Sequence, residues 1–578
     1  MAGELLGGLG SGRCVLGWVP GRVLGRVLGP PGFLCRSFCH PGAIPGLLFG
    51  HAAVRPGAGA PGVAQDGRVR RPLVPLAALA LALVASGCTG PGAATAASAT
   101  PRTSASGVAA TATPAADLVQ PPAIAWTSCR DGFQCSALTV PLDYANRSKG
   151  TVSLRLIRLP ASDPAHRVGA LLINPGGPGV SAVDFVRGFA KGGAPAALHQ
   201  RFDMVAFDPR GTTGSAPVHC LDTAQLDRFF HVDPQPDDPA EIRDLDQENR
   251  LLAAGCARRS GRILPYVTTD IAARDMDSVR AALREPKLTY LGYSYGTALG
   301  AAYLDQFPTR VRAMVLDGAL DPRSTWDQVL AGQARGFEQA FGSWLAWCNT
   351  HRTTCAFRRA VPGDLGAAYD AIAAKVDKTP LPGAGKRTVG PGELSYGAGQ
   401  ALYSTSYWGF LGDALADAQR GDGNLLLQLS DLYLERTPTG YSNAIEANFA
   451  VNCADKPWPK DIGAYQKLAD RMRKEAPRFG PSIAWSGEGC AVWPVPATGR
   501  PHAVTGNGSP PILVIGTTRD PATPYVWAQG LAAQLAHGVL LTHVGDGHTA
   551  YSGAAPTCIV GPVNAYLITA KAPAPARC

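Results

Sequence analysis

Short, nearly continuous apolar runs recur along the chain after about residue 120, and most of them end in a turn rich in glycine or proline. Such runs are typical of parallel strands that are buried on both faces. Stretches with helical spacing lie between them, as in residues 270–283. The alternation predicts an α/β fold with a doubly wound, mostly parallel sheet. The predicted buried strands are residues 168–174, 202–208, 288–292, 311–317 and 511–516.

The strand signal lapses between residues 322 and 509. Residues 326–348 and 411–434 instead have helical spacing and many aromatic side chains. A long helical stretch between two strands of one sheet predicts an inserted helical cap. The sheet domain is then built from two parts, residues 121–321 and residues 510–578.

The first 120 residues do not fit this folded domain. Residues 63–88 have the features of an export signal: basic residues, a short apolar stretch and small residues that end in Cys88. The apolar stretch is too short to cross the roughly 30 Å hydrocarbon layer. The Ala-Ser-Gly-Cys ending resembles a bacterial lipoprotein box, which would make Cys88 the lipidated first residue. A simple secretory signal is the alternative.

The segments on either side of this signal have different compositions. Residues 89–120 consist largely of Ala, Thr, Ser, Pro and Gly, so they predict a flexible tether. Residues 1–62 belong to neither region, and we interpret them as an extension caused by a misassigned start codon. The expected product is exported, either as a cell-surface lipoprotein or as a secreted protein.

Charge argues against a nucleic-acid partner. The 578 residues carry a net charge of +9, but six of these charges arise before Cys88. The remaining chain is nearly balanced and has no basic run with interleaved aromatic residues, so it lacks an electrostatic footprint for DNA or RNA. A membrane is expected as a partner only through a lipid at Cys88.

Ten cysteines follow Cys88, and an even number in an exported chain favours five disulfides. Short spacing and chain order predict the pairs Cys129–Cys135, Cys220–Cys256, Cys348–Cys355, Cys453–Cys490 and Cys558–Cys578. A metal site would need closely spaced cysteines together with histidines, and that pattern is missing. We therefore predict no metal.

The sequence Gly-Tyr-Ser294-Tyr-Gly follows a predicted strand and precedes a helical stretch. This is the setting of a nucleophile elbow, which presents a serine on a strained turn. A serine hydroxyl barely ionises at neutral pH, so it needs a base and an acid that orients the base. His548, in a glycine-rich loop, is the predicted base, and Asp520, after the strand 511–516, is the predicted acid. Asp317 is the rival acid.

Attack by Ser294 creates an oxyanion that needs preset hydrogen-bond donors. The backbone N–H of Tyr295 should be one donor, because it follows the nucleophile. The loop Asn-Pro-Gly-Gly-Pro-Gly at residues 174–179 should supply the other, and we choose Gly177. A plain tight turn is the alternative for this loop.

Together these motifs resemble the secreted tripeptidyl aminopeptidases of actinobacteria, which are α/β hydrolases related to proline iminopeptidase. The resemblance covers most of residues 126–578 and includes CSALTVPLDY at 135–144, NPGGPG at 174–179, FDPRG at 207–211, GYSYGT at 292–297, CAVWP at 490–494 and GDGHT at 545–549. One departure is Thr213, where the family pattern has glycine. A positive φ at this position would strain the threonine.

The resemblance implies removal of short peptides from free N-termini by a serine peptidase without a cofactor. A substrate ammonium then needs a shielded carboxylate, and Glu446 and Asp455 of the cap are the candidates. An exported carboxylesterase or lipase with the same triad is one alternative. A non-catalytic surface protein that binds its ligand on a hydrolase scaffold is the other.

Overall fold

The structure is a computed structural model that describes residues 121–578. The predictions for the export signal, Cys88, the tether and the start codon lie outside this range. Among the described residues, no helix is both long and apolar enough to cross a membrane.

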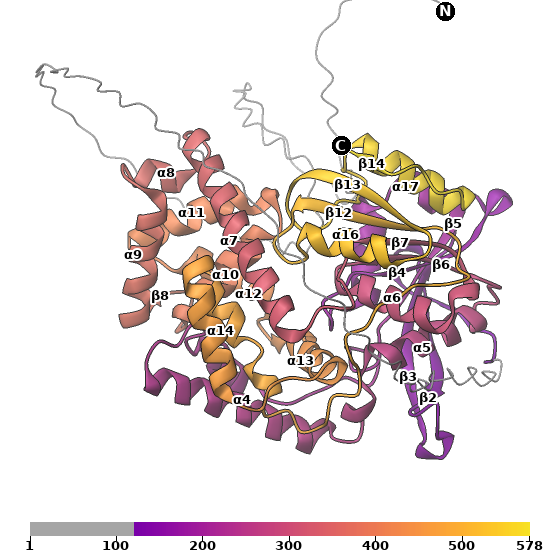
Figure 1. Ribbon diagram of the computed structural model, residues 1–578, viewed down its shortest axis with the longest axis horizontal. Helices are drawn as coiled ribbons and strands as arrows, with labels where there is room; N and C mark the ends of the chain where they lie inside the picture. Colours follow the sequence, from indigo (N-terminus) through magenta and orange to yellow (C-terminus); the bar gives the residue numbers. More distant parts are fainter. Residues whose placement is uncertain (1–120) are drawn as a thin grey trace, which may run out of the picture. The chain divides into compact units, whose positions relative to one another are not determined.

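The centre of the described chain is a ten-stranded mixed sheet (Figure 1) with the order β1-β2-β3-β5-β4-β6-β7-β12-β13-β14. The strands from β1 to β5 in this order pair in antiparallel fashion, and all later neighbours are parallel. The sheet confirms the predicted α/β class. The strands are β1 (Thr127–Ser128), β2 (Gln134–Pro141), β3 (Thr151–Leu159), β4 (Gly169–Asn174), β5 (Phe202–Phe207), β6 (Leu288–Tyr293), β7 (Val311–Asp317), β12 (Ile512–Arg519), β13 (Gly538–Asp546) and β14 (Ala576–Arg577).

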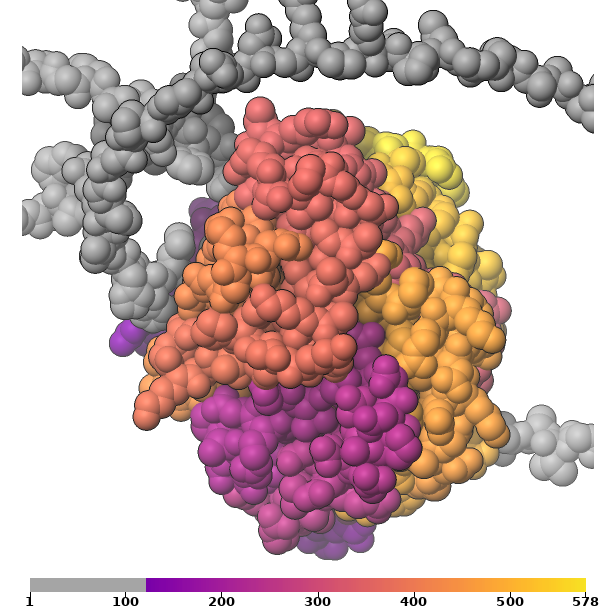
Figure 2. Space-filling view, turned by 90° about the vertical axis from the view of Figure 1, so that its left-hand side faces the viewer, coloured from indigo at the N-terminus to yellow at the C-terminus, as the bar shows by residue number. Residues whose placement is uncertain are grey.

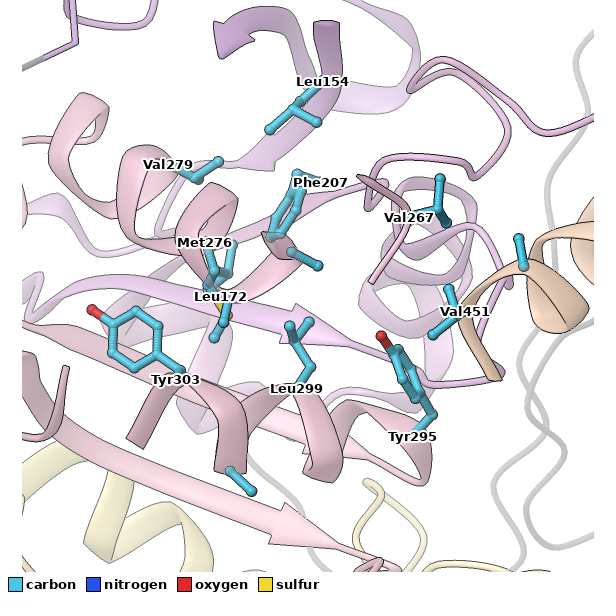
Figure 3. Close-up of a cluster of buried hydrophobic side chains, with 14 of the residues drawn as sticks. Leu154, Leu172, Phe207, Val267, Met276, Val279, Tyr295, Leu299, Tyr303 and Val451 are labelled. Carbon is cyan, nitrogen blue, oxygen red and sulfur yellow. The ribbon is translucent and has the colours of Figure 1, made fainter. Parts of the chain in front are cut away.

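Helices cover both faces of the sheet, which explains why its central strands are apolar at every position. Alternate residues of one strand enter different cores: Leu171 packs with α1 (Ala182–Gly188), α2 (Ala196–Arg201) and α17 (Thr557–Thr569), whereas Leu172 packs on the opposite face. That face is covered by α5 (Thr269–Ala282), α6 (Tyr295–Gln306) and α16 (Tyr525–Gln534). Figure 3 shows part of the second core, which continues from the sheet to Val451.

The chain between β7 and β12 forms the cap, which is largely helical. Its small strands pair only with one another, β8 (Leu381–Pro382) with β9 (Thr388–Val389) and β10 (Arg436–Thr437) with β11 (Gly440–Tyr441). Its helices are α7 (Trp326–Thr350), α8 (Ala356–Ala360), α9 (Leu365–Lys378), α10 (Pro391–Leu402), α11 (Trp408–Gln419), α12 (Asn424–Tyr433), α13 (Ala444–Asp455), α14 (Ile462–Glu475) and α15 (Gly480–Trp485).

A second segment joins the cap. Helices α3 (Thr223–His231) and α4 (Pro239–Ser260) lie between β5 and β6 in the sequence. Leu245 of α4 nevertheless packs on the cap cluster of α7, α14 and α15, and Phe230 of α3 packs on Tyr396 of α10. Figure 2 shows this segment beside the cap on one face of the molecule.

Five disulfides link the described cysteines, and they are the five predicted pairs. Cys220–Cys256 fastens α4 to the loop that follows β5, and Cys453–Cys490 joins the end of α13 to the segment after α15. The cap therefore carries covalent links that limit the entropy of its unfolded chain.

Candidate active site

Ser294 lies on the turn between β6 and α6, with φ 52° and ψ −124°. This backbone is strained for a residue with a side chain. The flanking glycines make the turn possible, since a Cβ at Gly292 would lie 2.5 Å from the Gly296 carbonyl oxygen, and one at Gly296 would lie 2.8 Å from the Asn174 carbonyl oxygen. The backbone N–H of Ser294 also donates to the carbonyl of Asp317 at 2.9 Å.

His548 and Asp520 are in contact. The Nδ1 atom of His548 lies 2.9 Å and 3.0 Å from the two carboxylate oxygens of Asp520. Asp520 is 2% exposed, and it also accepts hydrogen bonds from the N–H groups of Ala522, Thr523 and Thr549. The carboxylate is thereby fixed, and Nε2 is the imidazole nitrogen left free for another partner.

The end of β7 connects this pair with the serine turn. Its Asp317 carbonyl holds the Ser294 N–H, and a Cβ at the next residue, Gly318, would lie 3.2 Å from the His548 Cε1 atom. Among the described residues the Ser294 hydroxyl has no hydrogen bond. The structure thus brings all three predicted residues to one end of the sheet.

Asp317, the rival acid, is bound elsewhere. Its carboxylate accepts hydrogen bonds from the N–H groups of Ala550 and Tyr551 at 2.7–3.1 Å. Burial raises the pKa of this carboxyl to about 6, although these hydrogen bonds oppose the shift. Asp317 therefore supports the loop that carries His548 and makes no hydrogen bond to the imidazole.

The loop of residues 174–179 packs directly against the serine turn. A Cβ on Gly176 would lie 2.8 Å from the Ser294 Cβ and 2.9 Å from the Tyr295 nitrogen, so the bare backbone is required there. Gly177 and Pro178 line the neighbouring cavity together with Tyr295. The loop has the position expected of an oxyanion hole.

Thr213, which replaces a glycine of the family pattern, has a positive φ, the conformation that glycine favours. Thr213 has φ 35°, and its N–H donates to the side chain of Asn443 in the cap at 2.8 Å. The threonine is strained as expected, and a contact with the cap holds it in place.

A cavity of about 340 Å³ adjoins Ser294. Aromatic side chains dominate its wall, and they come from α3, the cap and the sheet domain. Among the described residues that line it, none is Asp or Glu, and Lys456 is the one lysine or arginine. The aromatic wall consists of Phe229, Phe230, Tyr295, Phe337, Tyr396, Tyr403, Tyr433, Phe449, Trp458, Phe479 and Trp485.

The two acids predicted to bind a substrate ammonium are absent from this wall. Glu446 is 3% exposed, and its Oε1 accepts from the N–H groups of Cys220 and Leu221 at 2.6 Å and 3.0 Å. Asp455 accepts from both the N–H and the hydroxyl of Thr269. Both carboxylates satisfy buried donors and tie the cap to the sheet domain.

Several residues that reach the cavity or the pair had no signal in the sequence. Thr523 donates its hydroxyl to Asp520 at 3.0 Å, and its oxygen lies 3.2 Å from Nδ1 of His548. The Tyr403 carbonyl, at the end of α10, accepts from the His548 N–H at 2.8 Å. The contact between Tyr403 and His548 joins distant segments, so the sequence could not show it. The contact between Thr523 and Asp520 could have been suggested by their spacing of three residues.

The His548–Asp520 pair predicts the acid limb of the pH profile. Burial lowers the pKa of His548, but the charge and hydrogen bond of Asp520, with the charge of Asp317, together raise it above 6.5. A protonated imidazole cannot accept the serine proton. We therefore expect kcat/KM, measured between about pH 5 and 9, to fall as the pH drops through a midpoint above 6.5. A midpoint below that value would contradict the raised pKa.

The fold and this site define a class of protein, the serine hydrolases of the α/β-hydrolase fold. Residues 169–357 match the family model described as alpha/beta hydrolase fold, and residues 476–578 match the one described as TAP-like protein. The tripeptidyl aminopeptidase of Streptomyces lividans is 35% identical over 463 residues, covering 78% of this chain and 85% of that relative. The chain belongs to this tripeptidyl aminopeptidase family and is a serine peptidase.

Other relatives differ in their named activities. Serine protease Hip1 of Mycobacterium tuberculosis is 38% identical over 480 residues, covering 78% of this chain and 89% of that protein. Carboxylesterase B of the same organism is 37% identical over 461 residues, covering 76% of this chain and 86% of that protein. The family thus contains a protein named for ester hydrolysis alongside the peptidases.

Proposed function

We propose that the chain is an exported aminopeptidase that releases short peptides, of tripeptide length, from free N-termini. The observation that carries this proposal is the place of Ser294 beside a cavity walled by the cap, at the same end of the sheet as the His548–Asp520 pair. The named activity of the Streptomyces relatives supports the length of the product. The five disulfides support export, and Cys88 is our candidate lipid anchor.

The proposed reaction is acyl transfer. The Ser294 oxygen attacks the peptide carbonyl while His548 takes its proton through Nε2, and Asp520 stabilises the imidazolium that forms. The N–H groups of Tyr295 and Gly177 stabilise the oxyanion. His548 then gives the proton to the leaving amine, and an ester between Ser294 and the released peptide remains. Water, activated by the same histidine, hydrolyses this ester and restores the serine.

The cap and the size of the cavity favour the end of a peptide chain as the substrate over an internal segment of a folded protein. The wall combines the serine turn with residues of α3, α4 and the cap, so a substrate must enter between these parts. A volume of about 340 Å³ lies at the lower end of the range for ligand sites, which suits a few residues.

The test compares peptide anilides that have two, three or four residues, each with a free and an N-acetylated terminus. We expect the free tripeptide anilide to be cleaved with the highest kcat/KM and the acetylated one about 10- to 100-fold more slowly, because acetylation removes hydrogen bonds from a charged amine, each worth about 1.5–3 kcal/mol. Equal rates for the free and blocked tripeptides would contradict the aminopeptidase proposal.

Ester hydrolysis is the second candidate function. The similarity to Carboxylesterase B and the aromatic cavity wall favour it. Short acyl esters assayed beside the anilides distinguish the two functions. Turnover of esters without any cleavage of the peptide amides would replace the peptidase proposal with this one.

A further inference from the structure

A row of polar side chains runs along α13 beside the cavity. Asn448 and Asn452 are four residues apart and share one helix face, and Lys456 follows four residues later, directly after the last residue of α13. All three residues line the cavity. The Asn448 side chain donates to the carbonyl of Pro178 at 3.2 Å, and Asn452 donates to the Asn448 side chain at 2.8 Å. The row therefore starts at the loop beside Ser294 and ends at Lys456.

Lys456 is the charged end of this row. Its side chain is half-buried and lines the cavity, and among the described residues its ammonium group has no hydrogen bond and no ion pair. The carboxylate of the neighbouring Asp455 is held by Thr269. Burial lowers the pKa of Lys456, and the charge of Asp455 opposes this shift. A shielded cation without a partner is costly, so an anionic ligand group would be stabilised there.

The length of the row fits a short peptide. Lys456 lies eight positions after Asn448, and α13 covers all but the last of these positions, which corresponds to about 12 Å at 1.5 Å per residue. An extended peptide advances about 3.3–3.6 Å per residue, so this distance takes three or four residues. The two asparagine amides can accept and donate hydrogen bonds to the backbone of such a peptide.

From this geometry we infer that Lys456 selects peptides with a carboxylate three or four residues from the scissile bond. The carboxylate lies on the leaving side and is either an acidic side chain or a free C-terminus, because the third residue on the acyl side of a released tripeptide carries the ammonium itself. The inference rests on the proposed peptidase function and adds the substrate class, acidic peptides, to it. The substrate ammonium then binds away from this end of the row, because Lys456 would repel it.

The test uses hexapeptides that differ by Glu or Gln at one position, together with pairs that have a free or an amidated C-terminus. The readout is the ratio of kcat/KM for the acidic and the neutral member of each pair. For the wild-type enzyme we expect a ratio of about ten or more at the matching position, since a hydrogen bond to a charged group is worth about 1.5–3 kcal/mol. The pair that gives the largest ratio identifies whether an acidic side chain or the free C-terminus supplies the carboxylate.

Three variants show whether Lys456 causes this preference. Lys456→Met should bring the ratio close to one, and Lys456→Glu should reverse it in favour of the neutral peptide. Lys467→Met, which alters an exposed lysine of α14, is the matched control and should keep the wild-type ratio. Wild-type ratios near one at every position, or an unchanged ratio in Lys456→Met, would overturn the inference.

Failure of the peptidase proposal can be recognised separately. Cleavage of neutral peptides without any acidic preference leaves the proposed function intact and rejects the role of Lys456. If no peptide is cleaved, calorimetry with Ser294→Ala and the same Glu/Gln pairs measures binding directly. Tighter binding of the acidic peptide, lost in Ser294→Ala/Lys456→Met, supports the carboxylate site, and equal binding rejects it.

Discussion

Ser294→Ala is expected to lower kcat for a free tripeptide anilide by about 10⁶, because the covalent intermediate can no longer form. The remaining rate should come from the oxyanion donors and substrate binding alone. Removal of this hydroxyl should hardly affect the fold, since it makes no hydrogen bond among the described residues. Steady-state kinetics with the purified variant measure the effect.

A covalent probe provides the control for this experiment. A fluorophosphonate should label the wild-type enzyme with one equivalent and leave Ser294→Ala unlabelled, while the thermal unfolding midpoints of both agree. The Ser406→Ala variant, which alters an exposed serine of the cap, should label like the wild type. Labelling of Ser294→Ala, or a loss of kcat below about tenfold, would show that another residue is the nucleophile.

Asp520→Asn is expected to lower kcat by about 10⁴, with little change in KM. The substituted amide can donate a hydrogen bond to Nδ1 of His548, which favours the tautomer that carries its proton on Nε2. That nitrogen then cannot take the serine proton. The present contacts of 2.9 Å and 3.0 Å between Nδ1 and the carboxylate are the basis of this expectation. The measurement is kcat and KM at a pH above the midpoint of the acid limb.

Asp317→Asn is the matched comparison for this variant. Asp317 accepts hydrogen bonds from Ala550 and Tyr551 and has none to the imidazole. Its replacement should therefore lower the unfolding temperature and have a much smaller effect on kcat than Asp520→Asn. A larger kinetic effect at position 317 would transfer the acid role to Asp317.

The sequence was sufficient where short segments determine the geometry. Parallel strands place their carboxyl ends along one edge of a sheet, so Ser294, Asp520 and His548 could be expected together once each was assigned to the end of a strand. The strained turn at Ser294 also follows from the two glycines beside it. The five disulfides followed from spacing and order because each joins two cysteines with no other cysteine between them in the sequence.

The sequence could not show the contacts of a side chain whose partner lies far away along the chain. Glu446 and Asp455 both lie on α13 of the cap, but their partners, Cys220, Leu221 and Thr269, are about 190–230 residues distant. No local pattern shows whether a carboxylate binds backbone groups or faces a cavity. The same reason applies to α3 and α4, whose contacts with the cap leave no trace in their own periodicity.

The hydrogen bond from the backbone N–H of His548 to the Tyr403 carbonyl links the predicted base to the cap. The Tyr403 ring also meets the imidazole edge to face at 5.4 Å. Any tilt of α10 that widens the entrance would therefore pull on the histidine loop and misalign the base. A state with an open cap would then differ from the state in which His548 is aligned with Ser294. A chimaera that takes its cap from a relative must therefore match position 403 as well as the residues that line the cavity.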